Sequence, residues 1–227
     1  MEHPPIVHTP RHEGKTRRTP KPKSAYRSDP LFLRNGYRQE GRWGIPVIRK
    51  QTIDLTQPVG LIACTDTRPN DTKNNARGVH HFVDDARFED VYRHPERKLP
   101  KYSQYRFVLT PDYSLFPEMP LWRQIESVGK SRWCGAYWQE HGLTVIPTMG
   151  WGLAPTFDFC FAGVEEGSVV AVSTLGCRTG RTRFLRGYDA MLERVRPEAV
   201  ICLGRPVPGM RGELVAVDYL SSRKAVR

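Results

Sequence analysis

The sequence has no long hydrophobic run. None of its apolar segments approaches the roughly 18 residues that a helix needs to cross a bilayer, and the N-terminal residues have no apolar signal core before their prolines and charges. We therefore expect a soluble, cytoplasmic protein with no membrane partner.

Paired cysteines are also missing. The five cysteines are odd in number, lie far apart and form no C-x-x-C or Cys/His pair. Cys64, Cys160 and Cys202 lie inside apolar strings, which is typical of small buried side chains. We expect reduced thiols rather than metal ligands or nucleophiles.

The common catalytic motifs are absent as well. The chain has no G-x-S-x-G, no H-E-x-x-H and no complete P-loop, which removes the easily recognised enzyme classes but not enzymes in general. The stretch "STLGCRTGRTRFL" is comparable to a phosphate loop, but Gly176 and Gly180 are one residue too close and Arg181 replaces the lysine. Arg178 and Arg181 predict an anion site here, and the alternative is a solvated arginine-rich loop.

Positive charge is concentrated at the two ends of the chain. The formal charge is +11, yet residues 1–50 hold twelve Lys or Arg against four Asp or Glu, while residues 51–222 hold twenty of each. We divide the chain into a basic, proline-rich, disordered arm (1–28), a single α/β domain (29–222) and a basic tail (223–227). The arm predicts phosphate contacts with nucleic acid, and the alternative is a solubilising tail. The residues expected to make these contacts are Arg17, Arg18, Lys21 and Lys23.

Short apolar strings rich in β-branched residues recur after position 45. Each has the length of a strand that is buried on both faces, a pattern typical of parallel sheets covered by helices. They are "GIPVI", "GLIACTD", "RFVLTPD", "LTVIPTM", "SVVAVSTLG", "AVICLG" and "ELVAVDY".

Helical patterns lie between several of these strings. We expect a short helix from Asp84 or Asp85 to His94, a long one from Pro120 to Gly142, and a third from Thr182 to the residue before Pro197. The alternation predicts right-handed βα units and a parallel or mostly parallel sheet. We favour a barrel-like or half-barrel arrangement, because no G-x-G-x-x-G opens the first unit; the alternative is an open doubly wound sheet.

Both architectures bind ligands beyond the carboxyl ends of the strands. The residues expected on this rim are Thr65, Asp66, Asp112–Ser114, Thr148–Trp151, Ser173–Gly176, Gly204 and Arg205. In "LTPDYSLFPEMP", Asp112 and Tyr113 follow a strand directly, so we expect both to face the rim, in a loop stiffened by prolines. The alternative is that Asp112 only forms a turn.

Three acids are candidates for chemistry. Asp66, Asp112 and Asp158 can share acid and base roles or coordinate Mg²⁺, the one cofactor that the sequence suggests, although three loop acids are common in α/β proteins. Tyr113, Ser114, Trp151 and Ser173 are candidate binding residues on the same rim. Trp151 is either a stacking platform or an aromatic lid over the core.

The adjacent His80 and His81 would point in different directions on a strand, so we do not expect a shared ligand role. We expect both on the surface or at a strand edge.

Several blocks resemble, in order, a known family. They are "GVHHFVDDARFEDVYRHPERKL", "LTPDYSLFPEMPLWRQI", "GAYWQEHGLTVIPTMGW", "FDFCFAGVEEGSVVAVSTLG" and "FLRGYDAMLERVRPEAVICLG". Together they are similar, over about residues 43–219, to a family of phage and mobile-element proteins known as a domain of unknown function, number 4417. The resemblance implies a mobile-element setting and supplies no catalytic set. The matching blocks contain Asp84, Asp85, Asp112, Ser114, Trp138, Trp151 and Ser173.

Three functions fit these observations. The first is an accessory protein that binds nucleic acid or another phosphate-bearing ligand through its basic arm and a strand-end pocket. The second is a metal- or carboxylate-dependent hydrolase or transferase acting on a phosphorylated substrate. The third is a protein that binds a host protein. The sequence indicates no oligomeric state.

Overall fold

The computed structural model describes residues 23–177 and 180–222 of the 227. Arg17, Arg18, Lys21 and Arg178 lie outside the described residues. The chain divides into two units, with the boundary after Gly36. The first unit contains the short helices α1 (Lys23–Tyr26) and α2 (Pro30–Leu33). Asp29 caps α2, because its carboxylate accepts a hydrogen bond from the Leu31 N–H.

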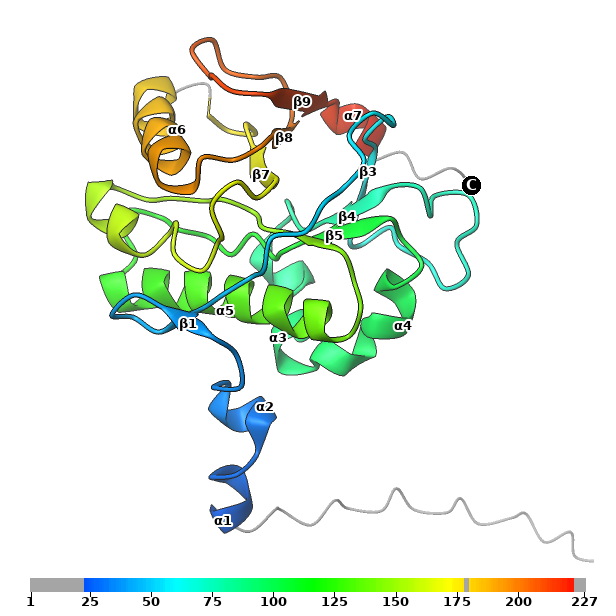
Figure 1. The fold of residues 1–227 in the computed structure, drawn as a ribbon, viewed down its shortest axis with the longest axis vertical. Coiled ribbons are helices and arrows are strands. Elements are labelled where there is room, and N and C mark those ends of the chain that lie inside the picture. The colour runs from blue at the N-terminus through cyan, green and yellow to red at the C-terminus, as the bar shows by residue number, and fades with distance from the viewer. Residues whose placement is uncertain (1–22, 178–179, 223–227) are drawn as a thin grey trace, which may run out of the picture. The chain divides into compact units, whose positions relative to one another are not determined.

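The second unit is built on parallel strands (Figure 1). One sheet has the order β3-β4-β5-β6 and another the order β7-β8-β9, and all neighbours in both sheets are parallel. A separate antiparallel pair, β1 (Gln39–Glu40) and β2 (Ile45–Pro46), precedes them. The parallel strands are β3 (Leu61–Ala63), β4 (Gly78–His80), β5 (Phe107–Leu109), β6 (Val145–Ile146), β7 (Val170–Ser173), β8 (Val200–Leu203) and β9 (Leu214–Val217).

The two parallel sheets are joined into one. Thr148, just beyond β6, forms a parallel bridge with Ala171 of β7. The Met149 N–H donates to the Ala171 carbonyl at 2.7 Å, and the Ala171 N–H donates to the Pro147 carbonyl at 2.9 Å. The strand order therefore follows the chain order without a reversal. This confirms the barrel-like arrangement over the doubly wound alternative, which requires a switch point.

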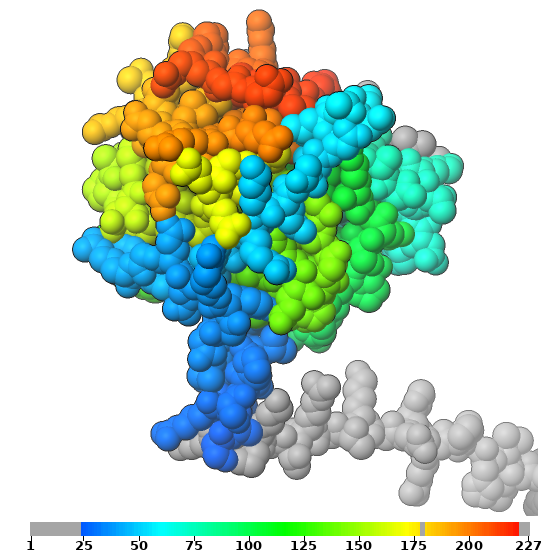
Figure 2. Space-filling model, in the orientation of Figure 1, coloured from blue at the N-terminus to red at the C-terminus, as the bar shows by residue number. Residues whose placement is uncertain are grey.

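The inner face of this curved sheet forms its own core. Gly78 of β4 packs directly against the Phe107 ring, where there is no room for a side chain, because a Cβ at this position would lie 2.0 Å from the ring. Helix α7 (Tyr219–Ser222) contacts β3, and Figure 2 shows the cyan surface near β3 against the red surface near β9 and α7. The inner cluster includes Leu61, Phe107, Leu109, Ile146, Ala171, Ile201, Leu203 and Val217.

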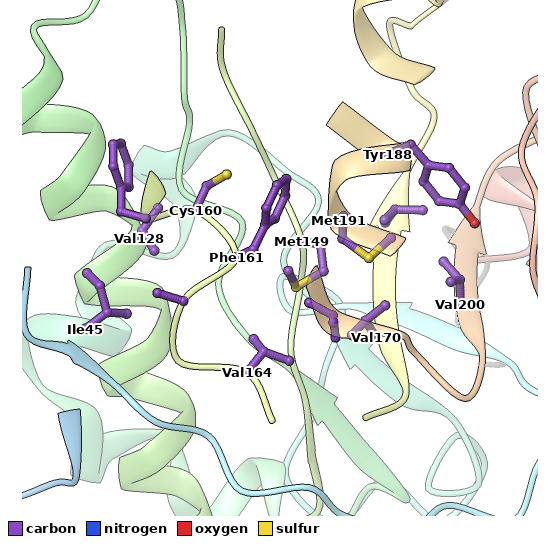
Figure 3. Close-up of a cluster of buried hydrophobic side chains, with 14 of the residues drawn as sticks. Ile45, Val128, Met149, Cys160, Phe161, Val164, Val170, Tyr188, Met191 and Val200 are labelled. Carbon is purple, nitrogen blue, oxygen red and sulfur yellow. The ribbon is translucent and has the colours of Figure 1, made fainter. Parts of the chain in front are cut away.

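Helices cover the outer face. One outer cluster packs α5 (Leu121–Glu140) with α3 (Asp90–Arg93) and α4 (Leu99–Tyr102) over β3 to β6. The other joins α5 and α6 (Arg181–Val195) through the segment around Phe161, which lies between Val128 and Met191 (Figure 3). Short 3₁₀ helices complete the outer layer, namely η1 (Asp85–Arg87), η2 (Pro95–Arg97) and η3 (Ala154–Asp158).

The expected helices differ in detail from the observed ones. Helix α5 begins one residue after Pro120 and ends at Glu140, within two residues of the expected bounds, and Gly142 follows it at a φ of +81°. The helix expected from Asp84 to His94 is broken into η1 and α3. Thr182 is not the cap of α6, since that helix begins one residue earlier after Gly180. Within the described residues, no helix is both long and apolar enough to cross a membrane.

Candidate functional site

A cleft of about 700 Å³ lies beyond the carboxyl ends of β3 to β7. Its walls come from the loops that follow successive strands, as the sequence predicted for a parallel sheet. Thr65 and Asp66 follow β3, Asp85 follows β4, and Asp112 follows β5. The remaining wall includes His80, Phe82, Asp84, Arg87, Tyr113, Ser114, Phe116, Gly150, Trp151, Ser173, Leu175, Cys177 and Tyr219.

Asp112 is the acid most strongly influenced by its surroundings. It sits in the extended segment after β5, and its carboxylate approaches the backbone of Gly150 on the neighbouring loop. Burial raises the pKa of Asp112 to about 7, and the negative charge of Asp85 acts in the same direction. The nearby guanidinium of Arg132 opposes this shift. Asp112 is therefore present in both protonation states near neutral pH.

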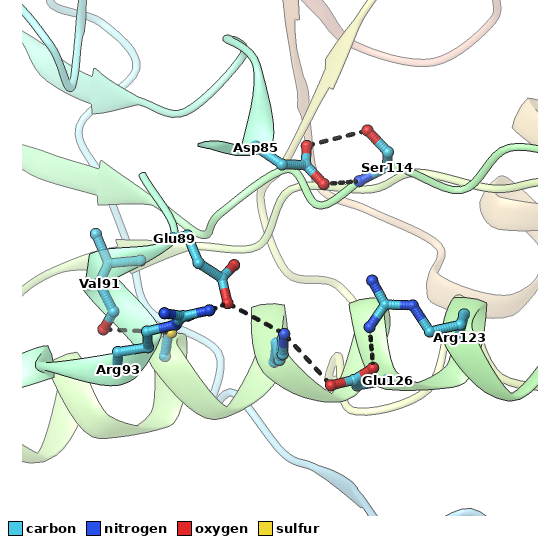
Figure 4. Close-up of polar contacts among 9 residues, drawn as sticks. Asp85, Glu89, Val91, Arg93, Ser114, Arg123 and Glu126 are labelled. Atoms are coloured by element: carbon cyan, nitrogen blue, oxygen red, sulfur yellow. Dashed lines mark hydrogen bonds and ion pairs between the residues drawn. The ribbon is translucent and has the colours of Figure 1, made fainter. Parts of the chain in front are cut away.

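Asp85 is fixed in place by Ser114. One carboxylate oxygen accepts from the Ser114 N–H at 3.1 Å and the other accepts from the Ser114 Oγ at 3.0 Å (Figure 4). These bonds tie the loop after β4 to the loop that carries Asp112. The sequence suggested only that Asp84 or Asp85 starts a helix; the place of Asp85 in the matching family blocks was the one signal of a further role.

His80 forms part of the floor of the cleft and is only 1% exposed. Its Nδ1 accepts the Phe82 N–H at 3.2 Å, while its Nε2 has no hydrogen-bond partner among the described residues. Burial lowers the pKa of His80 to about 4, so the ring is neutral at pH 7.

His81 points to the other side of the strand. Its ring contacts the Leu109 carbonyl at 3.0 Å and the Tyr102 hydroxyl at 3.1 Å, and it stacks on Trp138. Burial lowers the pKa of His81 to about 3. The surface prediction was wrong for both histidines, because β4 is an inner strand with cover on both faces.

Tyr113 faces the core more than the rim. It is 7% exposed and packs in the outer cluster, with its ring 5.1 Å from the Phe88 ring and the Lys130 ammonium 5.5 Å from its centre. Tyr113 also contributes to the cleft wall beside Asp112, although most of its ring packs in the core, because successive side chains of an extended segment point to opposite sides. Its hydroxyl has no partner among the described residues.

Arg132 lies behind Asp112 and is 2% exposed. Its guanidinium donates to the carbonyls of Thr148, Ala162 and Cys160 at 2.9 to 3.1 Å. A small cavity of about 20 Å³, lined by both Asp112 and Arg132, has room for about one water molecule. A fixed positive charge thus lies on the core side of Asp112, and the Asp85 charge lies on the cleft side.

Other predicted residues also reach the cleft. Asp66 and Ser173 line its wall, and the Ser173 Oγ accepts from the Leu175 N–H at 3.2 Å. Trp151 is half-buried: its ring lies 5.2 Å from the Phe184 ring, and it covers Gly187, where a Cβ would lie 2.2 Å from it. It is therefore largely part of the core, with one part lining the cleft.

Two predicted residues lie elsewhere. Asp158 is exposed and accepts from Arg42 at 2.7 Å and from the Trp43 indole at 2.8 Å. Arg181 donates to the Pro208 carbonyl at 2.7 Å, beside a separate groove between the loops after β7 and β8. Asp158 therefore does not join Asp66 and Asp112, and the described part of the chain contains no group of three or more His, Cys, Asp or Glu side chains that could hold a metal ion.

The lining of the cleft is acidic. Four aspartates, Asp66, Asp84, Asp85 and Asp112, share it with Arg87, the one lysine or arginine among the described lining residues. Aromatic side chains from several loops complete the wall. Fold and site together define a barrel-like β/α protein with an acidic strand-end cleft.

The chain belongs to the family described as "Domain of unknown function (DUF4417)", which matches residues 37–220. It is 39% identical over 181 residues to the "Gene 1 protein" of Mycobacterium phage D29, an alignment that covers 78% of this chain and 66% of that protein. It is 38% identical to the "Gene 1 protein" of Mycobacterium phage L5, covering 78% of each. Both relatives are phage proteins, in agreement with the phage setting that the resemblance implied. No solved structure matches the chain.

Proposed function

We propose that the strand-end cleft is the acid–base site of a hydrolase or transferase, with Asp112 as the group that exchanges a proton with the substrate. The observation that carries this proposal is the position of Asp112 in the cleft, next to a second carboxylate and ahead of a buried guanidinium. An acid or base works best when its pKa lies near the working pH, and the pKa of Asp112 is raised to about 7.

The two carboxylates have different roles in this proposal. Asp112 takes a proton from an attacking hydroxyl group or water, or gives one to the leaving group. Asp85 is a positioning residue: Ser114 holds its carboxylate, and its negative charge favours the protonated form of Asp112. A carboxyl group whose pKa is raised by burial and by a neighbouring carboxylate is a common arrangement for such chemistry.

A panel of p-nitrophenyl esters, glycosides and phosphates tests the proposal. We expect release of nitrophenol from at least one ester or glycoside, with a rate that changes around pH 7. Asp112→Asn should abolish it, and Asp158→Asn is the matched control, because Asp158 is an exposed aspartate outside the cleft. An Asp112 carboxyl that titrates near pH 4 by ¹³C NMR, with no hydrolysis in the panel, would reject the proposal.

A second candidate function concerns the basic arm. Residues 1–50 hold twelve Lys or Arg and only four Asp or Glu, and this excess of positive charge favours contact with nucleic acid phosphates. The acidic cleft does not favour such contact, so we assign it to the arm alone. Electrophoretic mobility shifts at low salt, with the full chain and with residues 1–28 removed, test this function. Loss of the shift on deletion supports it, and no shift with the full chain contradicts it.

We also propose that the protein acts in the cytoplasm. The five cysteines are unpaired, and four of them are buried, which suits a reducing compartment.

A further inference from the structure

The negative charge of the cleft is concentrated on one side. Asp66 follows β3, Asp84 and Asp85 follow β4, and Asp112 follows β5, and all four line the cleft. These strands are direct neighbours in the sheet, where adjacent strands lie about 5 Å apart. The loops that leave them therefore bring four carboxylates to the same part of the wall.

These carboxylates have no counter-ion among the described residues. Asp85 bonds only to Ser114 (Figure 4), and Asp112 has neither a hydrogen bond nor an ion pair. Arg132 lies behind Asp112, but its guanidinium donates to backbone carbonyls instead. Outside the cleft, by contrast, nine described acids form ion pairs, namely Glu40, Glu89, Asp90, Glu126, Asp158, Glu165, Glu166, Asp189 and Glu198.

Asp112 gives a second sign that a positive charge is missing from this wall. Burial raises the pKa of its carboxyl to about 7, and the repulsion from Asp85 adds to this effect. A cation beside Asp112 would offset both the lost solvation and the repulsion. The neighbouring His80 cannot take part in binding, because its Nε2 is completely buried, whereas Asp112 lines the open cleft.

The loops after β6 and β7 give the cleft a different character. They contribute Trp151, Ser173, Leu175 and Cys177 to the described lining, without a charged side chain. The Phe116 ring, which is 59% exposed, also lines the cleft. Aromatic faces attract organic cations and pack against flat apolar groups. The volume of about 700 Å³ is that of a site for a small molecule.

The spread of the carboxylates favours a delocalised charge over a metal ion. Metal ions need several oxygen ligands that converge to about 2 to 2.6 Å, and no group of three or more acids, histidines or cysteines in the described part of the chain is placed to hold one. A planar amidinium or guanidinium presents several N–H donors and can reach separate carboxylates. A phosphate or carboxylate ligand would be repelled by the four aspartates.

We infer that the cleft binds a small organic cation, with an amidinium or guanidinium group against the aspartates after β3 to β5 and an apolar body against the loops after β6 and β7. This inference rests on the same site as the proposed function and names the class of its substrate. It replaces the phosphorylated substrate suggested by the sequence, because the described lining is acidic and Arg181 lies beside another groove.

Three compounds of nearly the same shape separate the ligand classes: benzamidine is a cation, benzamide is neutral and benzoate is an anion. Their binding to the full-length protein is measured by calorimetry at about pH 8 and low salt. We expect benzamidine to bind at least about tenfold more tightly than benzamide, and benzoate not to bind. Added salt should weaken the binding of benzamidine and leave that of benzamide nearly unchanged.

The position of the ligand is tested by ¹³C NMR of the protein labelled at its aspartate carboxyls. Benzamidine should lower the pH at which Asp112 titrates, because a nearby cation favours the ionised carboxylate, and benzamide should not lower it. The charges of Asp85, Arg132 and Cys177 also interact with Asp112, and they are present with either ligand. Asp158 is the internal control, since it lies outside the cleft and should titrate as before.

A double variant extends the test. Asp66→Asn with Asp84→Asn removes two charges from side chains that are at least partly exposed, and benzamidine should bind about tenfold more weakly. The affinity for benzamide should stay the same, and Asp158→Asn should bind benzamidine as the unaltered protein does. The NMR titration of the unaltered protein decides the question if the double variant fails to fold.

Three results would overturn the inference: benzamide or benzoate that binds as tightly as benzamidine, benzamidine that leaves the titration of Asp112 unchanged, or MgCl₂ that moves the cleft aspartate resonances when benzamidine does not. The proposed acid–base function is judged separately. Benzamidine that binds as expected to a protein without hydrolytic activity would support the ligand class and reject the catalytic role of Asp112. Hydrolysis without a preference for benzamidine would do the reverse.

Discussion

Replacing Asp112 by asparagine should remove a pH-dependent penalty on folding. The pKa of this carboxyl is raised from 3.8 to about 7 in the folded protein. A raised pKa stabilises the fold at low pH, and this stabilisation is lost as the pH rises from the unfolded value through about 7. At about 1.4 kcal/mol per pKa unit, a shift of about three units corresponds to about 4 kcal/mol.

The two buried histidines change the stability of the fold with pH in the opposite direction. Burial lowers the pKa of His80 to about 4 and that of His81 to about 3. The stability that they contribute is fully present above the unfolded histidine pKa of about 6.5, and it is lost as the pH falls through their pKa values in the folded protein. The stability curve of the unaltered protein therefore contains opposing slopes. Both proteins contain these histidines, so the difference between them isolates Asp112.

Urea unfolding of the unaltered protein and of Asp112→Asn, at about pH 4 and about pH 8, measures this difference. We expect the free energy of unfolding of the variant, relative to that of the unaltered protein, to rise by up to about 4 kcal/mol from pH 4 to pH 8. Asp158→Asn is the control. Hydrogen bonds from Trp43 and then Arg42 lower the pKa of Asp158, so removing its carboxylate should not increase the relative stability between pH 4 and pH 8. A difference between Asp112→Asn and the unaltered protein that stays constant from pH 4 to pH 8 would refute the burial of an ionisable Asp112.

Three further predictions follow from the packing around the cleft. Gly187→Ala places a Cβ where the Trp151 ring lies, so urea unfolding should show a loss of about 1 to 3 kcal/mol. Arg132→Met leaves three backbone carbonyls without their donor and removes the positive charge near Asp112; we expect a loss of about 3 kcal/mol or more and a higher Asp112 pKa by NMR. Cys177, the one cysteine that is not buried, should react first with a thiol reagent, and the others only on unfolding.

The fold could be predicted well because its signals are local. From "GLIACTD" onward, each β-branched string contains a short parallel strand, and Pro120 and Gly142 flank α5 as expected. The helix expected from Asp84 to His94 failed because its start is held by a distant contact. Asp85 bonds to Ser114, 29 residues away, instead of capping the next turn.

The site was predicted only where backbone topology decides it. Asp66 and Asp112 follow strands directly, and parallel strands end on one side of a sheet, so both reach the cleft. Asp158 follows no strand directly: it ends a 3₁₀ turn and faces Arg42 at the surface. His80 was missed because burial depends on the number of strands beside β4, which periodicity does not reveal.

Proton binding at Asp112 and ligand binding in the cleft are coupled. A neutral ligand that displaces water from the cleft removes solvation from the ionised carboxylate and brings no charge in return, so it raises the Asp112 pKa further. By linkage, such a ligand must bind more tightly when Asp112 is protonated. A neutral compound that binds in the cleft should therefore bind more tightly to the unaltered protein below pH 7 than above it, whereas Asp112→Asn should show little change in affinity. Equal pH dependence in the two proteins would show that the protonation of Asp112 is not coupled to ligand binding.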